Sequence, residues 1–214
     1  MTKRLSRKAV LAVVAGVLLI GLALALSSAA QPGEVKTEAQ MPHSKILVLY
    51  YSRTGTTAKL GQAIAQATGA DVEALLDTKD RQGAWGFVRS IIDAGRRSTT
   101  TLKPLKVDPA QYELVILGTP DWGRSISSPM RTFLAAYKGK LKQVAFFLTD
   151  GTSDHTGIFK EMAELSGREP VATLGVPHDD VWKDRCAEPL KKFLAALPAP
   201  QVQPAEPLPV PAGR

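Results

Sequence analysis

Residues 45–65, KILVLYYSRTGTTAKLGQAIA, constrain the fold of this chain more than any other stretch. Residues 45–51 form a near-continuous apolar, β-branched and aromatic run, as expected of a strand that is buried on both faces of a parallel sheet. Leu60, Ile64 and Ala67 then recur at helical spacing. The stretch therefore predicts a strand, a polar turn and a helix in immediate succession.

The turn at residues 52–57 carries four hydroxyl side chains and one glycine. Amide groups at the start of a helix have no partner within the helix and carry partial positive charge, so a hydroxyl-lined turn there suits a phosphate dianion. Gly55 lets the main chain approach a ligand closely or take a positive φ. The alternative is that a serine or threonine simply caps the helix. The turn matches neither Walker A, since no Gly-Lys-Ser/Thr follows, nor GxGxxG, since it has one glycine.

The first thirty residues have the pattern of an export signal or of a membrane anchor. Basic residues precede the uncharged stretch at 9–26, and the small residues Ser28 and Ala30 suit cleavage after Ala30. The eighteen residues of this stretch are also just enough to span a bilayer as a helix. Because the basic cluster stays cytoplasmic, both readings predict an exported domain, periplasmic or on the extracytoplasmic face of the membrane.

The chain divides by composition into four parts. We expect a signal or anchor at 1–30, a polar tether at 31–44, a globular domain at 45–197 and a disordered proline-rich tail at 198–214. The leader holds four of the 27 Lys and Arg and none of the 20 Asp and Glu, so the rest carries a net charge of +3. No nucleic-acid partner is therefore expected. A single cysteine excludes an intramolecular disulfide and a cysteine-held metal.

Strand and helix patterns alternate through residues 45–197. Besides the first strand, expected strands lie at 71–76, 112–117, 144–148 and 169–176. Expected helices follow the polar turn and then lie at about 85–97, 129–137, 154–165 and 181–197. This order predicts an α/β fold with a five-stranded parallel sheet covered on both faces. Ligands of such sheets bind beyond the carboxyl ends of the strands.

Two more strand ends carry unusual loops. Trp122 follows the third strand between turn-forming residues, either to stack on a planar ring or to fold down onto the edge of the sheet. Hydroxyls surround Gly151 after the fourth strand, where backbone donors and acceptors suit a ring edge. With the turn at 52–57, these loops predict a site for a mononucleotide with a flat head group.

These loops also carry a resemblance to a known family. Ser52-x-Thr54-Gly55-x-Thr57 resembles the flavodoxin phosphate loop, and GTPDWGRSISSPMRTFL at 118–134 is similar to the loop and helix that hold the flavin there. The resemblance covers about residues 45–197. It implies a three-layer flavodoxin-like α/β sandwich with strand order 2-1-3-4-5 and FMN as the cofactor.

The resemblance also implies which residues bind FMN. The phosphate would be held without a cation by Ser52, Thr54, Gly55, Thr56 and Thr57, with Arg53 either helping or pointing to solvent. The isoalloxazine would lie along Thr119, Pro120, Asp121, Trp122 and Gly123, and its other side would meet Thr149, Asp150, Gly151 and Thr152. No catalytic side chain and no metal ligand is expected, because the cofactor carries the redox chemistry.

Three functions remain open at this point. The first is an exported or membrane-tethered FMN protein that moves electrons through bound flavin to a redox partner protein or a small acceptor. The second is an FMN-dependent NAD(P)H:quinone-type oxidoreductase, and the third is a flavin-less interaction domain. Membrane association would come through the N-terminal segment if it is not cleaved. The segment at 85–90 with Arg96 and Arg97 covers the site, forms a partner surface or is an ordinary amphipathic helix.

Overall fold

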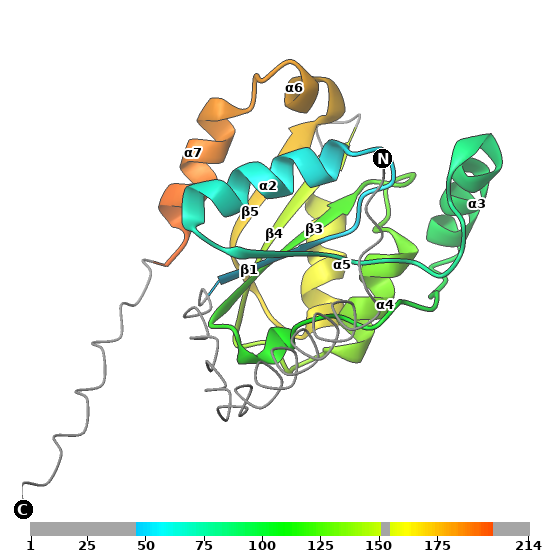
Figure 1. Ribbon diagram of the computed structural model, residues 1–214, viewed down its shortest axis with the longest axis horizontal. Helices are drawn as coiled ribbons and strands as arrows, with labels where there is room; N and C mark the ends of the chain where they lie inside the picture. Colours follow the sequence, from blue (N-terminus) through cyan, green and yellow to red (C-terminus); the bar gives the residue numbers. More distant parts are fainter. Residues whose placement is uncertain (1–45, 151–154, 199–214) are drawn as a thin grey trace, which may run out of the picture. The chain divides into compact units, whose positions relative to one another are not determined.

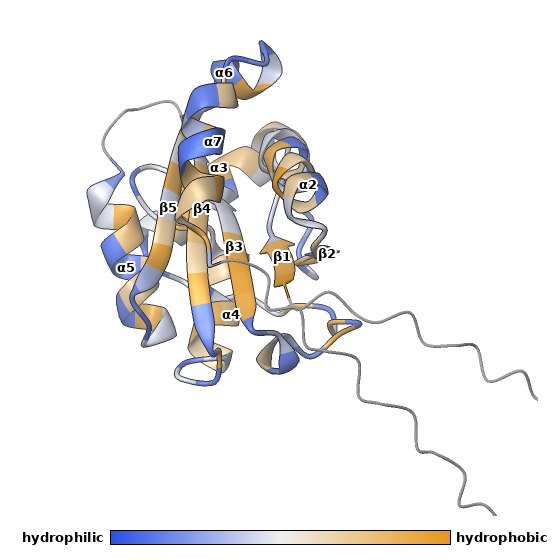
Figure 2. Cartoon of the chain, turned by 90° about the vertical axis from the view of Figure 1, so that its left-hand side faces the viewer, coloured by the Kyte–Doolittle hydropathy of each residue, from blue (hydrophilic) through white to orange (hydrophobic). Residues whose placement is uncertain are grey.

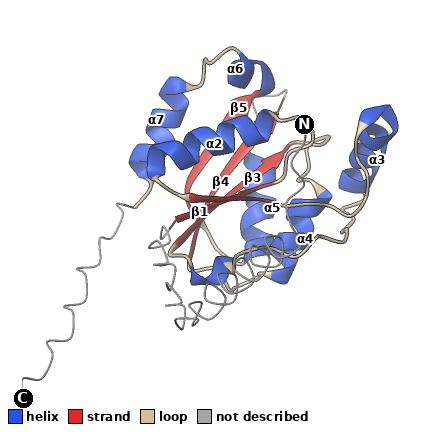
Figure 3. Cartoon of the chain, in the orientation of Figure 1, coloured by secondary structure: helices blue, strands red, loops and turns tan. Residues whose placement is uncertain are grey.

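The structure, a computed structural model, describes residues 46–150 and 155–198. The expected leader, tether and nearly all of the expected tail lie outside these residues. None of the helices in the described ranges is long and apolar enough to cross a bilayer. The elements, shown in Figures 1 and 3, are β1 (Ile46–Tyr50), α2 (Thr56–Thr68), β2 (Asp71–Ala74), α3 (Gly83–Gly95), η1 (Pro109–Gln111), β3 (Leu114–Pro120), α4 (Ser128–Ala136), β4 (Gln143–Asp150), α5 (Thr156–Ser166), β5 (Pro170–Pro177), α6 (His178–Trp182) and α7 (Ala187–Ala196).

The five strands form one parallel sheet in the order β2-β1-β3-β4-β5. This confirms the expected fold class and strand order. The register pairs Leu47 with Val115 and Val115 with Val144, all of them fully buried. Because the strands are parallel, their carboxyl ends meet at one edge of the sheet, and loops far apart in the sequence come together there.

Helices cover both faces of the sheet. Odd-numbered β1 residues such as Leu47 and Leu49 pack into a core with α4 and α5, and even-numbered ones such as Val48 pack with α2, α6 and α7. Figure 2 shows the strands as mainly hydrophobic between these helices. The three layers follow from the alternation of side chains along a strand, which sends successive residues to opposite faces.

The expectation of one closing helix at 181–197 is wrong. The chain forms α6 and α7, separated by a turn in which Asp184 has a φ of 52°. Pro189 lies in the first turn of α7, where its missing N–H costs nothing. In an uninterrupted helix the same ring would clash with the carbonyl of Arg185 and lose a hydrogen bond, so the helix restarts just before it.

The connection between β2 and β3 leaves the sheet, carries α3 and returns. Its two arms meet where Asp77 pairs with Leu102 in an antiparallel bridge and Thr78 donates its N–H to the Thr101 carbonyl at 2.9 Å. Figure 1 shows α3 at the periphery of the domain, attached through these arms. Ala94, at the end of α3, reaches the core that includes α4.

Candidate functional site

A pocket of about 190 Å³ lies at the carboxyl edge of the sheet. Its walls come from the ends of three adjacent strands, together with one residue of α3 and one of α6. The lining residues are Arg53, Thr54, Thr56, Thr57, Phe87, Pro120, Asp121, Trp122, Thr149, Asp150 and His178. Parallel strand order therefore brings the turn at 53–57 together with the strand ends at 120–122 and 149–150, which lie far from it in the sequence.

The first wall is the turn after β1, which enters the N-terminus of α2. Gly55 is the N-cap with a φ of 93°, a backbone conformation that side chains with a Cβ rarely adopt. No side chain caps the first turn of α2, and that turn has no acidic residue. The capping alternative is therefore not what the structure shows, because no side chain makes an N-cap hydrogen bond to this helix, and Ser52 Oγ accepts only from the N–H of Gly55 itself. Such an N-terminus attracts an anion.

The hydroxyls of this wall have partners that leave protons available. Thr56 Oγ1 accepts a hydrogen bond from Trp182 Nε1 at 2.9 Å, so its own O–H remains to be donated. Thr57 and Thr149 share a hydrogen bond of 2.8 Å between their Oγ1 atoms, and only one of these two protons is used in it. Ser52 Oγ accepts from the Gly55 N–H at 3.2 Å within the turn. The wall can therefore still donate to a ligand.

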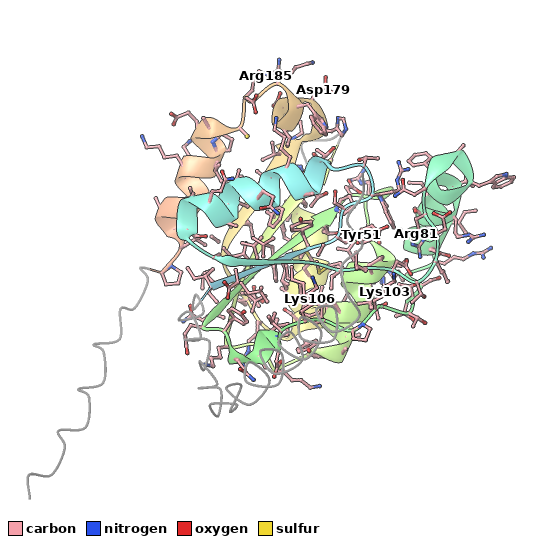
Figure 4. The ribbon with its side chains drawn as sticks, in the orientation of Figure 1. Tyr51, Arg81, Lys103, Lys106, Asp179 and Arg185 are labelled. Carbon is pink, nitrogen blue, oxygen red and sulfur yellow. The ribbon has the colours of Figure 1, made fainter. Side chains whose placement is uncertain are left out.

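Trp122 forms a second wall from a buried position. Its side chain is 4% exposed and meets Tyr51 edge to face, with ring centroids 5.4 Å apart. The guanidinium of Arg81 lies over the same indole at 5.6 Å from the ring centroid. Figure 4 shows Tyr51 and Arg81 between the sheet and α3. Of the two readings of Trp122, the structure follows the folded-down one, although the residue still lines the pocket.

Arg81 links this wall to α3 through ion pairs. The residue is 3% exposed and forms ion pairs with Asp77 and, at 2.9 Å, with Asp93. Burial by itself lowers the pKa of Arg81, but the hydrogen bonds and charges of the two carboxylates outweigh it and raise the pKa above its ordinary value. Arg81 therefore stays charged and ties α3 to the indole of Trp122.

Carboxylates form the third part of the site. Burial raises the pKa of Asp121, and the neighbouring charge of Asp150 adds to this, against the lowering effect of the Arg124 and Ser125 backbone N–H groups. Those N–H groups donate to Asp121 Oδ1 at 2.6 and 3.2 Å. Asp150 Oδ2 lies 2.5 Å from His155 Nε2. This end of the pocket is thus acidic, whereas the turn after β1 contributes Arg53.

The structure brings most of the predicted site residues together. Lining the pocket are Arg53, Thr54, Thr56, Thr57, Pro120, Asp121, Trp122, Thr149 and Asp150. Ser52 and Gly55 shape the turn behind the lining. Thr119 is fully buried beneath it, with Oγ1 bonded to Ser127 Oγ at 3.0 Å, and Gly123 turns the loop away at a φ of 66°. Gly151 and Thr152 lie outside the described residues.

Three further residues belong to the site. Phe87 of α3 lines the pocket beneath the Arg53 guanidinium, which lies 5.1 Å from its ring centroid. His178 lines it from the start of α6, and Trp182 covers Gly55 at 3.9 Å from where a Cβ would lie. The sequence signal for Phe87 was its place in the segment for which covering the site was one of three open interpretations. For His178 and Trp182, the only signal in the sequence was their nearness to the end of the fifth strand.

No group of three His, Cys, Asp or Glu side chains within residues 46–150 and 155–198 is placed to bind a metal ion.

Comparisons with known proteins agree with this architecture. Residues 45–174 match the family model described as Flavodoxin. Among the curated proteins, no sequence matches the chain.

Solved structures of similar fold include a candidate flavoprotein of Bacteroides uniformis, with a TM-score of 0.56 and 23% identity, over 67% of this chain and 98% of that one. A candidate flavoprotein of Bacteroides eggerthii has a TM-score of 0.54 and 23% identity, over 68% and 99%. A flavoprotein of Lactobacillus acidophilus, solved in complex with FMN, has a TM-score of 0.53 and 22% identity, over 67% and 99%. At these identities the likeness is one of fold.

Proposed function

The chain belongs to the flavodoxin family, and from this premise we propose that its domain binds FMN in the pocket at the carboxyl edge of the sheet and moves electrons through the bound flavin. The observation that carries the proposal is the convergence of the 52–57 turn, the 120–122 loop and the end of β4 on one pocket. FMN is the ligand of the Lactobacillus acidophilus flavoprotein, which shares the fold.

The turn after β1 fits the phosphate of FMN. A dianion at the uncapped N-terminus of α2 meets the partial positive charge of the helix start. Thr54, Thr56 and Thr57 supply hydroxyl donors, and Arg53 adds a full charge at the rim. These residues bind and orient the nucleotide.

The volume of the pocket suits partial enclosure. About 190 Å³ is below the roughly 300–1,000 Å³ of pockets that bury small ligands. FMN would therefore be enclosed in part and exposed in part, which suits a protein that exchanges electrons at its surface. Bound flavin supplies the electron-transfer chemistry, and the protein sets its orientation and electrostatic surroundings.

Partial exposure also favours one second candidate, an FMN-dependent NAD(P)H:quinone oxidoreductase, because a second planar ligand could reach an open flavin. For either function we propose an exported or membrane-tethered location. The support is the sequence of residues 1–30, in which basic residues precede eighteen uncharged ones.

Titration of purified residues 31–214 with FMN tests the proposal. We expect a yellow protein and quenching of flavin fluorescence on binding. A colourless protein that leaves FMN fluorescence unchanged would overturn it and favour the flavin-less interaction domain. Bleaching of the bound flavin by NADH or NADPH, with many turnovers in the presence of a quinone, would identify the oxidoreductase; slow reduction without turnover would identify the electron carrier.

A further inference from the structure

Helix α3 presents three of its large apolar side chains to solvent, although Ile91 packs against the core and Phe87 lines the pocket. Trp85, Val88 and Ile92 are 84%, 42% and 45% exposed, and their spacing of three and four residues places them on one face. The buried residues of the same helix are small: Gly86, Ser90 and Ala94. A surface helix of a globular protein normally has the reverse arrangement, with its apolar stripe against the core.

Packing holds the helix in this orientation. A Cβ on Gly86 would lie 2.1 Å from the carbonyl carbon of Arg81, so only glycine allows this approach. Ser90 Oγ donates to the Gly86 carbonyl at 2.7 Å within the buried face. Arg81 reaches Asp93 at 2.9 Å and joins the helix to the rest of the domain. The apolar face therefore cannot turn inward without breaking these contacts.

The exposed charges around this face are positive. Arg89 lies on the helix beside Trp85 and Ile92, and Arg96 follows its last turn, both of them exposed. The next residue, Arg97, is also exposed but lies 3.8 Å from a carboxylate oxygen of Glu161. Asp93 is the one acidic residue of α3, and its carboxylate is ion-paired with the buried Arg81. We define the outer face of α3 as Trp85, Val88, Arg89, Ile92 and Arg96.

We propose that the outer face of α3 docks on the surface of an anionic lipid bilayer. An exposed Trp with aliphatic neighbours and flanking arginines is the composition of helices that lie in a membrane interface. The tryptophan and the apolar residues enter the headgroup region, while each arginine is attracted to the anionic headgroups. An anionic bilayer binds both the apolar side chains and the flanking arginines. A neutral protein groove would bind only the apolar side chains.

The length of chain outside the structure supports this occupant. Fourteen residues, 31–44, separate the end of the expected leader from the domain, which allows at most about 50 Å of extended chain. This step rests on the proposed membrane location, since a retained segment at 9–26 would keep α3 within reach of the same bilayer. Because Phe87 of α3 lines the pocket, docking would place the pocket beside the membrane.

Vesicle binding by residues 31–214 tests the inference without the leader. The match to three solved structures covers 98–99% of each of those chains, so a domain of this fold needs no further segment and is expected to fold on its own. Flotation with phosphatidylcholine vesicles, with and without phosphatidylglycerol, is compared for the native protein, Trp85→Ser/Ile92→Ser and the matched control Val72→Ser/Leu76→Ser. The control pair is also apolar and exposed but lies on β2 and just after it. Circular dichroism checks that each variant is folded.

We expect binding to anionic vesicles that falls at least about tenfold in Trp85→Ser/Ile92→Ser and is unchanged in the control. Arg89→Gln/Arg96→Gln should lose about tenfold at low salt and show little difference from the native protein at high salt. Absence of vesicle binding, or equal binding by Trp85→Ser/Ile92→Ser, would overturn the proposal. The proposal would also be overturned if the native protein were a dimer that did not bind vesicles and that Trp85→Ser/Ile92→Ser converted to a monomer. That result would assign the outer face of α3 to contact with a second copy of the chain.

FMN titration of the same samples separates this proposal from the proposed function. Normal FMN binding without vesicle binding would refute docking alone. Vesicle binding by a protein that takes no FMN would support docking and refute the flavin function.

Discussion

Thr57 joins the first turn of α2 to the end of β4 through a hydrogen bond between two hydroxyls. Its Oγ1 is 2.8 Å from Thr149 Oγ1, and both side chains are nearly inaccessible although they line the pocket. Because one of the two protons is not used between them, the pair can donate to a ligand while joining the start of α2 to the end of β4. Thr54, in contrast, is exposed at the rim of the same turn.

The double substitution Thr54→Val/Thr57→Val should weaken FMN binding by at least tenfold. Each lost hydrogen bond to a charged group is worth roughly 1.5–3 kcal/mol, and valine keeps the β-branched shape. Fluorescence titration gives the dissociation constant. Thr173→Val is the matched control, since Thr173 is exposed on β5 away from the pocket lining. Unchanged affinity in the double variant would count against the phosphate assignment.

Asp121 should make stability depend on pH in the direction opposite to most carboxylates. Burial raises its pKa above the ordinary 3.8, so the folded state binds its proton more tightly than the unfolded state. Its stabilising contribution is then complete below pH 3.8 and is lost as the pH rises through the raised pKa. Asp121→Asn is therefore expected to raise the melting temperature at neutral pH, and the gain should shrink on acidification.

Asp179 serves as the comparison, because its pKa is shifted in the opposite direction, below the ordinary value. Its hydrogen bond and ion pair with Lys183 lower its pKa, so Asp179→Asn should bring no gain at neutral pH. Thermal unfolding of both variants over a series of pH values checks the prediction. An Asp121→Asn variant that melts below the native protein at neutral pH would refute it.

The packing orientation of helix α3 is determined by its smallest residues. Gly86 allows the helix to approach the backbone of Arg81, and Arg81 then lies over Trp122 in the pocket wall. The orientation of α3, the exposure of its apolar side chains and the wall of the site are therefore linked through one close contact.

Gly86→Ala and Gly95→Ala should differ sharply. An added Cβ at Gly86 overlaps backbone atoms, so we expect a loss of about 1–3 kcal/mol in the free energy of unfolding. At Gly95 nothing lies within 4 Å, and the better helix propensity of alanine should stabilise by up to about 1 kcal/mol. Urea unfolding measures both. Equal effects of the two substitutions would show that the close contact does not hold α3.

The pocket depends on the fold of the whole domain. Thr57 meets Thr149 across 92 residues, and Trp182 bonds Thr56 across 126. A ligand that binds there binds only the folded state, so FMN should stabilise the entire domain by mass action.

At a free FMN concentration one hundred times its dissociation constant, the free energy of unfolding should rise by about 2.7 kcal/mol. For a domain of this size the melting temperature should then increase by about 5–10 °C. Riboflavin, which lacks the phosphate, is the control and should give a smaller shift at equal concentration. A shift of the same size with riboflavin would mean that the turn after β1 does not hold the phosphate.

The sequence alone determined the α/β class, four of the five strand–helix transitions along the domain and the three strand ends that line the pocket. These features depend on local causes: apolar periodicity, turn residues and the rule that parallel strands end at one edge. The break between α6 and α7 also had a local signal in Pro189, but the apolar pattern across 181–197 concealed it.

Only the tertiary structure decided that Trp122 is buried between Tyr51 and Arg81, that Phe87 and His178 line the pocket and that α3 is packed through its small residues. Helical spacing shows that apolar residues share a face but not whether that face turns inward. That choice depends on which backbone can approach Gly86 and which charge neutralises Asp93, contacts made only once the chain has folded.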